Sequence, residues 1–117
     1  MIVEIVTFSF PKGHDRASEL EAVRGVVGKW AANQELVRKH FLWGVGEAEG
    51  TGAGFYIWPS IEAAKRAHGD EWRETVKKRT GSYPTIRYFD LLALVDNEGG
   101  KITEWDATGK ARQLENA

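Results

Sequence analysis

Apolar positions in the first third of the chain follow two different periods, one typical of strands and one of helices. The segment Ile2–Phe10 is β-branched or aromatic at most positions and predicts a central strand. A turn at Pro11–Gly13 follows, and Asp15 or Ser18 can cap the next element as a helix, for which Asn33 is a stop signal. The apolar stripe of this helix recurs every three or four positions, at Leu20, Val23, Val27 and Trp30.

Two more strands are expected in the middle of the chain. Leu36–Val45 alternates imperfectly and predicts the second strand, and Phe55–Trp58 predicts a short third strand. The polar, Gly-rich sequence GEAEGTGAG between them predicts a hairpin loop. It contains neither GxGxxG nor GxxxxGK[ST], so it does not indicate a phosphate-binding loop.

The second half of the chain begins with another helix. Ser60 is a good N-cap, the helical pattern runs over Ile61–Arg79, and Gly81 is a stop signal. Thr85–Val95 predicts the fourth strand. The tail over residues 101–117 is mostly polar and is expected either to form a brief hairpin or to lie loose on the surface.

The order of elements, β-α-β-β-α-β, predicts an α+β fold of the ferredoxin-like split βαβ type. This fold places two helices on one face of a four-stranded antiparallel sheet. Residues 1–100 would form this domain, and residues 101–117 would be a polar C-terminal tail. Ile2–Phe10 and Leu91–Val95 are apolar on both faces, so the second sheet face also needs a cover. A second copy of the chain is the simplest cover, which predicts a homodimer.

Composition excludes several classes of function. The chain has 117 residues and a formal net charge of −1, which argues against a general nucleic-acid binder and against a polybasic membrane-surface protein. No apolar run approaches the roughly 20 residues that span a bilayer. Cysteine is absent, which excludes disulfides and thiolate catalysis, and the N-terminus resembles no signal peptide, so a cytoplasmic protein is expected.

Two stretches resemble a known group of proteins. They are KHFLWGVGEAEGTGAGFYIWPSIEAAKRAHGDEW and GSYPTIRYFDLLALVDNEGG. With the predicted layout they resemble the dimeric α+β-barrel superfamily, and within it most closely the small YdhR-type mono-oxygenases. The resemblance covers residues 1–100. It implies a substrate held between the sheet and the helices of each subunit, beside the second helix, and among single residues it implies Trp72 for this site. Haem-degrading members place an asparagine in the first strand, where this chain has none.

His68 and Trp72 are the main candidates for a site. On a continuous helix they lie four residues apart, on the face that meets the sheet, and the small residues around His68 leave space there. The pair is either ordinary core, with a hydrogen-bonded neutral histidine, or the wall of a pocket in which His68 acts as a catalytic base.

Other candidates lie on the predicted strands. Tyr56 and Trp58 share one face of the third strand and are expected to bind substrate if that face meets the helices. His40 in the second strand and Arg87 in the fourth are further candidates, although such residues more often lie at the surface. Three histidines without ligand spacing predict no metal site.

The sequence therefore favours a cofactor-free mono-oxygenase or a related small enzyme that acts on a planar aromatic or quinol-like compound. Such a compound, once deprotonated, reacts with O₂ directly, and the protein supplies orientation, a base and a dry cleft. The alternative is a dimeric module without catalysis that binds a small apolar ligand or serves in assembly. Haem binding is the third hypothesis.

Overall fold

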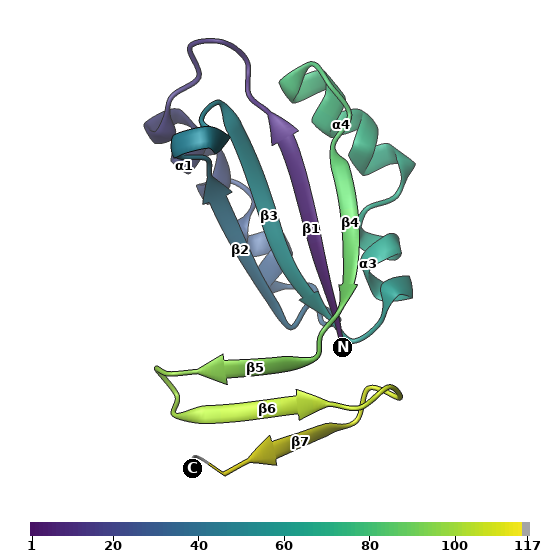
Figure 1. The fold of residues 1–117 in the computed structure, drawn as a ribbon. Coiled ribbons are helices and arrows are strands. Elements are labelled where there is room, and N and C mark those ends of the chain that lie inside the picture. The colour runs from purple at the N-terminus through teal and green to yellow at the C-terminus, as the bar shows by residue number, and fades with distance from the viewer. Residues whose placement is uncertain (116–117) are drawn as a thin grey trace.

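A computed structural model of the protein describes residues 1–115. Its main sheet has the strand order β2-β3-β1-β4 and is antiparallel throughout. The strands are β1 (Ile2–Ser9), β2 (Arg38–Trp43), β3 (Thr51–Trp58) and β4 (Thr85–Asp90). The helices α1 (Arg16–Arg24), α2 (Val27–Ala31), α3 (Ile61–Ala67) and α4 (Asp70–Thr80) lie behind one face of this sheet (Figure 1). The predicted ferredoxin-like α+β fold is confirmed.

Local signals set the outer ends of the two predicted helices, although the first is interrupted between α1 and α2 and the second between α3 and α4. The Asp15 carboxylate accepts a hydrogen bond of 2.8 Å from the Ser18 backbone N–H at the start of α1. The Ser60 hydroxyl accepts one of 3.2 Å from the Ala63 N–H at the start of α3. Gly81 ends α4 with a φ of +93°, a left-handed conformation that glycine adopts without strain.

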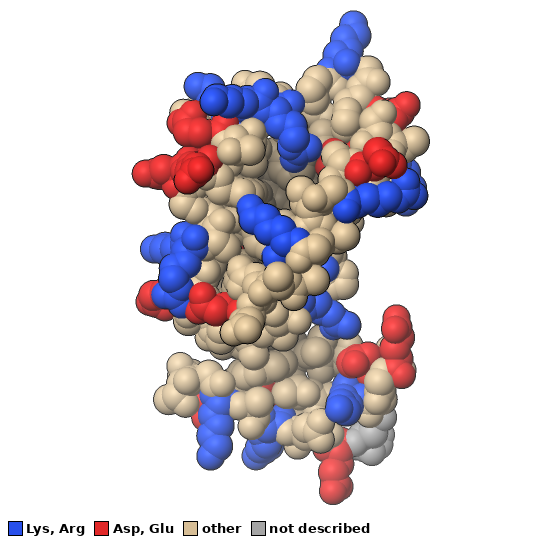
Figure 2. Space-filling model, turned by 180° about the vertical axis from the view of Figure 1, so that it is seen from behind, with Lys and Arg blue, Asp and Glu red and all other residues tan. Residues whose placement is uncertain are grey.

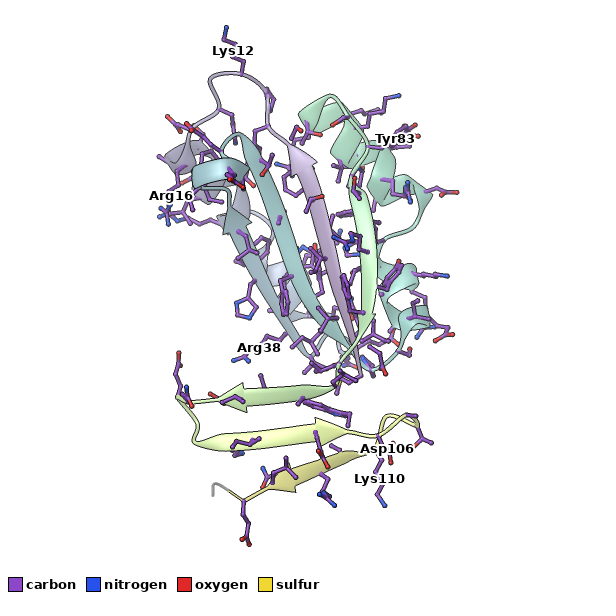
Figure 3. All side chains as sticks on the ribbon, in the orientation of Figure 1. Lys12, Arg16, Arg38, Tyr83, Asp106 and Lys110 are labelled. Carbon is purple, nitrogen blue, oxygen red and sulfur yellow. The ribbon has the colours of Figure 1, made fainter. Side chains whose placement is uncertain are left out.

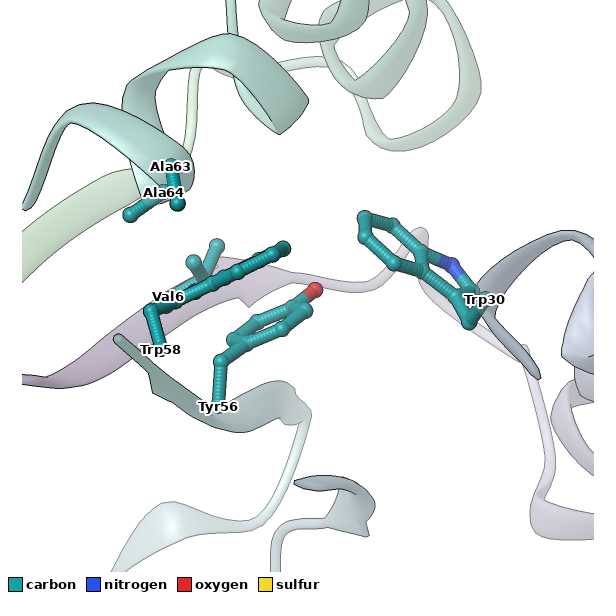
Figure 4. Packing of buried hydrophobic residues seen from close by; sticks show 6 residues of the cluster. All are labelled: Val6, Trp30, Tyr56, Trp58, Ala63 and Ala64. Carbon is teal, nitrogen blue, oxygen red and sulfur yellow. The ribbon is translucent and has the colours of Figure 1, made fainter. Parts of the chain in front are cut away.

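The core lies between the sheet and the helices. Trp58 and Tyr56 from β3 stack with their ring centroids 6.0 Å apart, and Trp30 from α2 meets the Tyr56 ring edge-on at 5.4 Å. Figure 4 shows the Tyr56 hydroxyl directed toward Trp30, with Ala63 and Ala64 above Trp58. The two alanines are fully buried, and their small side chains let α3 approach the indole closely.

The third strand is longer than the sequence predicted, because its Gly-rich half pairs with both neighbours. Thr51–Gly54 continues the ladder to β1, and Gly52 and Gly54 also pair with β2. A Cβ at Gly54 would lie 2.6 Å from the Tyr56 ring, and one at Gly52 would lie 2.4 Å from the Phe10 ring. Glycine therefore serves here to make room for aromatic rings, and the prediction of a loop was wrong over this half.

The second predicted helix is two helices. His68 and Gly69 leave the helical conformation, with ψ angles of 54° and −175°, and separate α3 from α4. Glycine lowers the stability of a helix at this point. The side chain of His68, at the break, is fully buried.

The fourth predicted strand also divides. β4 ends at Asp90, and β5 (Ala93–Asp96) belongs to a second, three-stranded sheet with β6 (Lys101–Trp105) and β7 (Ala111–Leu114). This small sheet lies beyond one end of the main sheet (Figure 1). Its last turn, which carries Asp106 and Lys110 in Figure 3, is held by the Asp106 carboxylate. That group accepts hydrogen bonds from the Thr108 hydroxyl and from the backbone N–H groups of Lys110 and Thr108, which lower its pKa.

We expect the domain to fold without residues 101–117. No strand of the small sheet pairs with a strand of the main sheet within residues 1–115, so its removal leaves the main ladders intact. Circular dichroism and urea unfolding of a chain that ends at Gly100 should show a folded protein with one cooperative transition. Loss of that transition would show that β6 and β7 are integral to the domain.

The sheet face opposite the helices is apolar and open. Ile5 pairs with Phe55 and Arg87 there, and Phe89 and Leu42 on the same face remain 42% and 46% exposed. An uncovered sheet face of this kind favours a second copy of the chain as its cover. We therefore expect light scattering at micromolar concentration to give twice the 13.1 kDa mass of the chain. The Phe89→Asp variant should shift to the monomer mass, and a monomer mass for the unaltered protein would contradict the expectation.

Candidate active site

A cleft of about 340 Å³ lies between the helices and the main sheet. Its walls come from α1, α2 and α4, and its floor comes from β2 and β3. Figure 2 shows the helix side of the molecule, where Lys and Arg side chains border a hollow in the surface. The aromatic residues that line the cleft are Phe8, Trp30, Phe41, Trp43, Tyr56 and Trp72. Such a site suits a flat apolar ligand.

Lys39 is the polar group on the floor of this cleft. Its Nζ lies 4.0 Å from the ring centroids of both Trp30 and Phe41 and 4.3 Å from that of Tyr56. The same Nζ donates a hydrogen bond of 2.6 Å to the Tyr56 hydroxyl. Lys39 and Tyr56 are directly opposed in the β2–β3 ladder, so backbone pairing fixes their contact.

The surroundings of Lys39 make it far less basic than an ordinary lysine. Burial among aromatic rings lowers its pKa from 10.5 to about 7, although the Glu4 carboxylate opposes the shift. Lys29 and Arg79 lower the pKa further through like-charge repulsion. At neutral pH a large share of Lys39 is therefore an uncharged amine, which can accept a proton.

Tyr56 differs from Lys39 in that it stays neutral. Burial raises the pKa of its phenol well above the ordinary value, and the Glu4 carboxylate raises it further. The hydroxyl accepts the hydrogen bond from Lys39 and can in turn donate one of its own. The two side chains form a hydrogen-bonding pair in an apolar cleft, in which Lys39 titrates near neutral pH and Tyr56 does not.

A buried acid and histidine lie behind the aromatic wall. Glu4 projects from β1 and is fully buried, as is the side chain of His68. The Glu4 Oε1 accepts a hydrogen bond of 2.9 Å from the Trp58 indole N–H and lies 2.8 Å from His68 Nδ1. This contact does not meet the geometry of a hydrogen bond, and neither ring nitrogen of His68 has a hydrogen-bond partner within residues 1–115.

His68 supports the wall and does not line the cleft. Its ring centroid lies 4.1 Å from that of Trp72 and 4.7 Å from that of Tyr56, and these two residues face the cleft instead. Trp58 lies deeper still, fully buried beside the Tyr56 ring. The structure thus brings together four of the predicted site residues, of which two line the cleft.

His40 and Arg87 lie on the opposite face of the sheet. The alternation of β2 directs Lys39 to the helices and His40 away from them, where its ring meets Phe55 at 5.7 Å. Arg87 pairs with Ile5 on that same open face, and its guanidinium lies over the Phe89 ring. His40 and Arg87 were expected to share the cleft with Trp72. Because successive residues of a strand point to opposite faces, they lie on the other side of the sheet instead.

Lys39, Glu4 and Trp30 are the site residues that the sequence analysis missed. The sequence did contain one indication of Glu4, because a carboxylate inside an otherwise apolar central strand needs a buried partner. Lys39 sat in a run of basic residues that is typical of a solvated edge strand. Only the register of β2 against β3 places it opposite Tyr56.

Residues 1–115 contain no group of three His, Cys, Asp or Glu side chains close enough to hold a metal ion. None of the histidines in that range lines the cleft. In the same part of the chain, no helix has the length and hydropathy to cross a membrane.

Comparison with known proteins adds evidence on the fold. No family model and no curated protein matches the sequence. Three solved structures are similar at TM-scores of 0.58 to 0.59. A "putative antibiotic biosynthesis monooxygenase" from Bordetella bronchiseptica is 18% identical, with 76% of this chain and 94% of that chain covered.

The other two structures align over nearly their whole length. A further antibiotic biosynthesis monooxygenase is 14% identical, with 79% of this chain and 99% of that chain covered. The protein Rv0793 from Mycobacterium tuberculosis is 12% identical, with 82% of this chain and 100% of that chain covered. The chain therefore shares the ferredoxin-like α+β fold of these three proteins over three quarters or more of its length.

Proposed function

We propose that the protein is a cofactor-free mono-oxygenase that acts on a planar aromatic compound in the cleft between the helices and the main sheet. The observation that carries this proposal is the Lys39 amine, held by Tyr56 within an aromatic cleft and poised near neutral pH. Two proteins of the same fold carry the name antibiotic biosynthesis monooxygenase, which supports the reaction class.

Lys39 would act as the general base. A neutral amine takes a proton from an acidic O–H or C–H group of the substrate when the two lie within hydrogen-bond reach. The resulting ammonium then stabilises the substrate anion next to it, and the Tyr56 hydroxyl can donate to the same oxygen. The aromatic walls hold the ring system flat and exclude water.

The electrons for the reaction come from the substrate. A CH₂ group between two aromatic rings loses a proton to Lys39, and its carbanion forms a bond to O₂. The Lys39 ammonium returns its proton to the peroxide anion, and the hydroperoxide so formed loses water, which leaves C=O in place of CH₂. One oxygen atom enters the product and the other leaves as water, so that the four electrons released by carbon reduce O₂ completely without an added reductant.

His68 and Glu4 would act as positioning residues in this scheme. Their buried pair supports the Trp72 and Tyr56 rings from behind, and the Glu4 charge acts on both Lys39 and Tyr56. Proton transfer is assigned to Lys39 because its side chain reaches the cleft, whereas the side chain of His68 is fully buried.

An oxygen-electrode assay with anthrone tests the proposal. Anthrone should be converted to anthraquinone with one O₂ consumed per product, and labelled O₂ should place one atom in the new carbonyl. The rate should rise as the pH passes through about 7, because the base must be neutral. If anthrone and a set of quinols bind in the cleft by titration and yet consume no O₂ above the protein-free rate, the oxygenase proposal fails.

A further inference from the structure

Basic side chains dominate the charge of the cleft. Its lining contains the four cationic residues Arg16, Lys29, Lys39 and Arg79 and the single acidic residue Glu19. The walls between them are aromatic or aliphatic. Lys39 lies on the floor, while Arg16 and Lys29 are exposed and Arg79 is half-exposed, which places these three at the mouth.

The positive charge at the mouth is poorly compensated. Glu19 is shared between His14 at 3.1 Å and Arg79 at 3.3 Å. No carboxylate of residues 1–115 lies within ion-pair distance of Arg16 or Lys29.

The cations at the mouth therefore repel the Lys39 ammonium on the floor of the apolar cleft. Lys29 and Arg79 both disfavour the charged form of Lys39, which shows that their repulsion reaches the floor. Low-dielectric walls strengthen such a field and attract an anion. An anion at the mouth would relieve this repulsion.

We propose that the ligand of the cleft is an aromatic acid, with its planar ring system between Trp30, Tyr56 and Trp72 and its carboxylate among Arg16, Lys29 and Arg79 at the mouth. This inference rests on the proposed function, because it names the class of substrate for the same site. The carboxylate fixes which end of the ring system enters first, and the opposite end meets Lys39.

Binding of the acid also acts on Lys39. A negative charge near Lys29 and Arg79 offsets their effect on Lys39 and raises its pKa. Because the base must be neutral, the pH at which the rate rises should lie higher for an acidic substrate than for a neutral one. The anchor at the mouth and the chemistry on the floor are thereby coupled through charge alone.

Calorimetric titration with 2-naphthoate and its neutral analogue 2-naphthamide tests the inference without any need for turnover. The two probes have the same ring system and nearly the same shape and differ in charge. We expect naphthoate to bind at least about tenfold more tightly than naphthamide at low salt, a difference of about 1.4 kcal/mol. High salt should reduce this preference.

Variants of the residues at the mouth show which charges cause the preference for naphthoate. The double variant Arg16→Gln, Lys29→Gln removes two exposed cations and should reduce the preference to about threefold or less. Lys65→Gln is the matched control, because Lys65 is exposed on α3 and outside the cleft lining, and it should keep the full preference. The nitrogen chemical shift of the Lys39 amine should report a higher pKa when naphthoate is bound.

The remaining outcomes of the titration each contradict a different part of the two proposals. Equal affinity for the two probes would overturn the inference and leave the oxygenase proposal standing. A preference that persists in the double variant would overturn the assignment to the mouth. Strong binding of naphthoate together with no O₂ uptake by any bound substrate would leave the aromatic-acid site standing and overturn the oxygenase. If neither probe binds, the aromatic-acid inference falls, and the anthrone assay alone decides the oxygenase proposal.

Discussion

The Lys39→Met variant is expected to consume O₂ with anthrone at least about 100 times more slowly than the unaltered protein, because a positioned general base contributes about that factor or more. Methionine keeps an unbranched apolar chain in the aromatic cage but has no proton acceptor of comparable strength. The loss should appear in kcat, while binding of a neutral aromatic probe should change little.

Two controls separate catalysis from charge and from folding. Lys39→Arg keeps the positive charge but cannot be deprotonated near pH 7, so it should be as slow as Lys39→Met. A variant that is slow because it is unfolded would lose the cooperative urea transition. An unchanged rate in both variants would show that Lys39 is not the base.

The Lys39→Met substitution should also stabilise the fold at neutral pH. The pKa of Lys39 is about 7 in the folded protein and near 10.5 in the unfolded chain, so between these values the unfolded state binds more protons. The free energy of unfolding of the unaltered protein therefore rises with pH across this window. At pH 7, Lys39→Met should be more stable by about 1–2 kcal/mol, since part of the side chain remains in water. The difference should shrink by about pH 9.

His68→Ala should lower the free energy of unfolding by about 2–4 kcal/mol. The substitution leaves a cavity among Trp30, Tyr56 and Trp72 and removes the polar ring atom that lies 2.8 Å from the buried Glu4 carboxylate. Urea unfolding monitored by tryptophan fluorescence measures the change.

Three further variants distinguish the causes. His68→Phe fills the volume and removes only the polar contact, so its cost isolates the effect on Glu4. Glu4→Gln combined with His68→Ala should cost less than the sum of the two single variants, since the buried charge is then absent. His40→Ala is the matched control on the open sheet face, and we expect a change within about 0.5 kcal/mol. A similarly small loss for His68→Ala would show that the buried pair contributes little.

Much of the fold followed from local patterns in the sequence. The strand at Ile2–Phe10, the cap residues Asp15 and Ser60 and the stop at Gly81 each depend on neighbours a few positions away, and each lies where the pattern indicated. The order of elements then limits the topology to few choices, because connections are short and sheets bury one face against helices. The ferredoxin-like fold was predictable for this reason.

The candidate site was predictable only in part. Tyr56 and Trp72 were identified because aromatic residues at strand and helix spacings must meet where a helix covers a sheet. Their neighbour His68 was identified as well, but on a continuous helix. The bend at Gly69 that buries His68 behind the cleft wall depends on tertiary packing, which overrides the local helical pattern.

By itself, the sequence determined the order of the main elements, the outer helix ends, the fold class and the aromatic character of the site. Only the tertiary structure decided that Lys39 faces the cleft and His40 the open face, because a shift of one residue in the β2–β3 register exchanges the two. It also decided the charge of the site. Arg16, Lys29 and Arg79 are far apart along the chain, and no local pattern specifies that three separate helices bring them to one mouth.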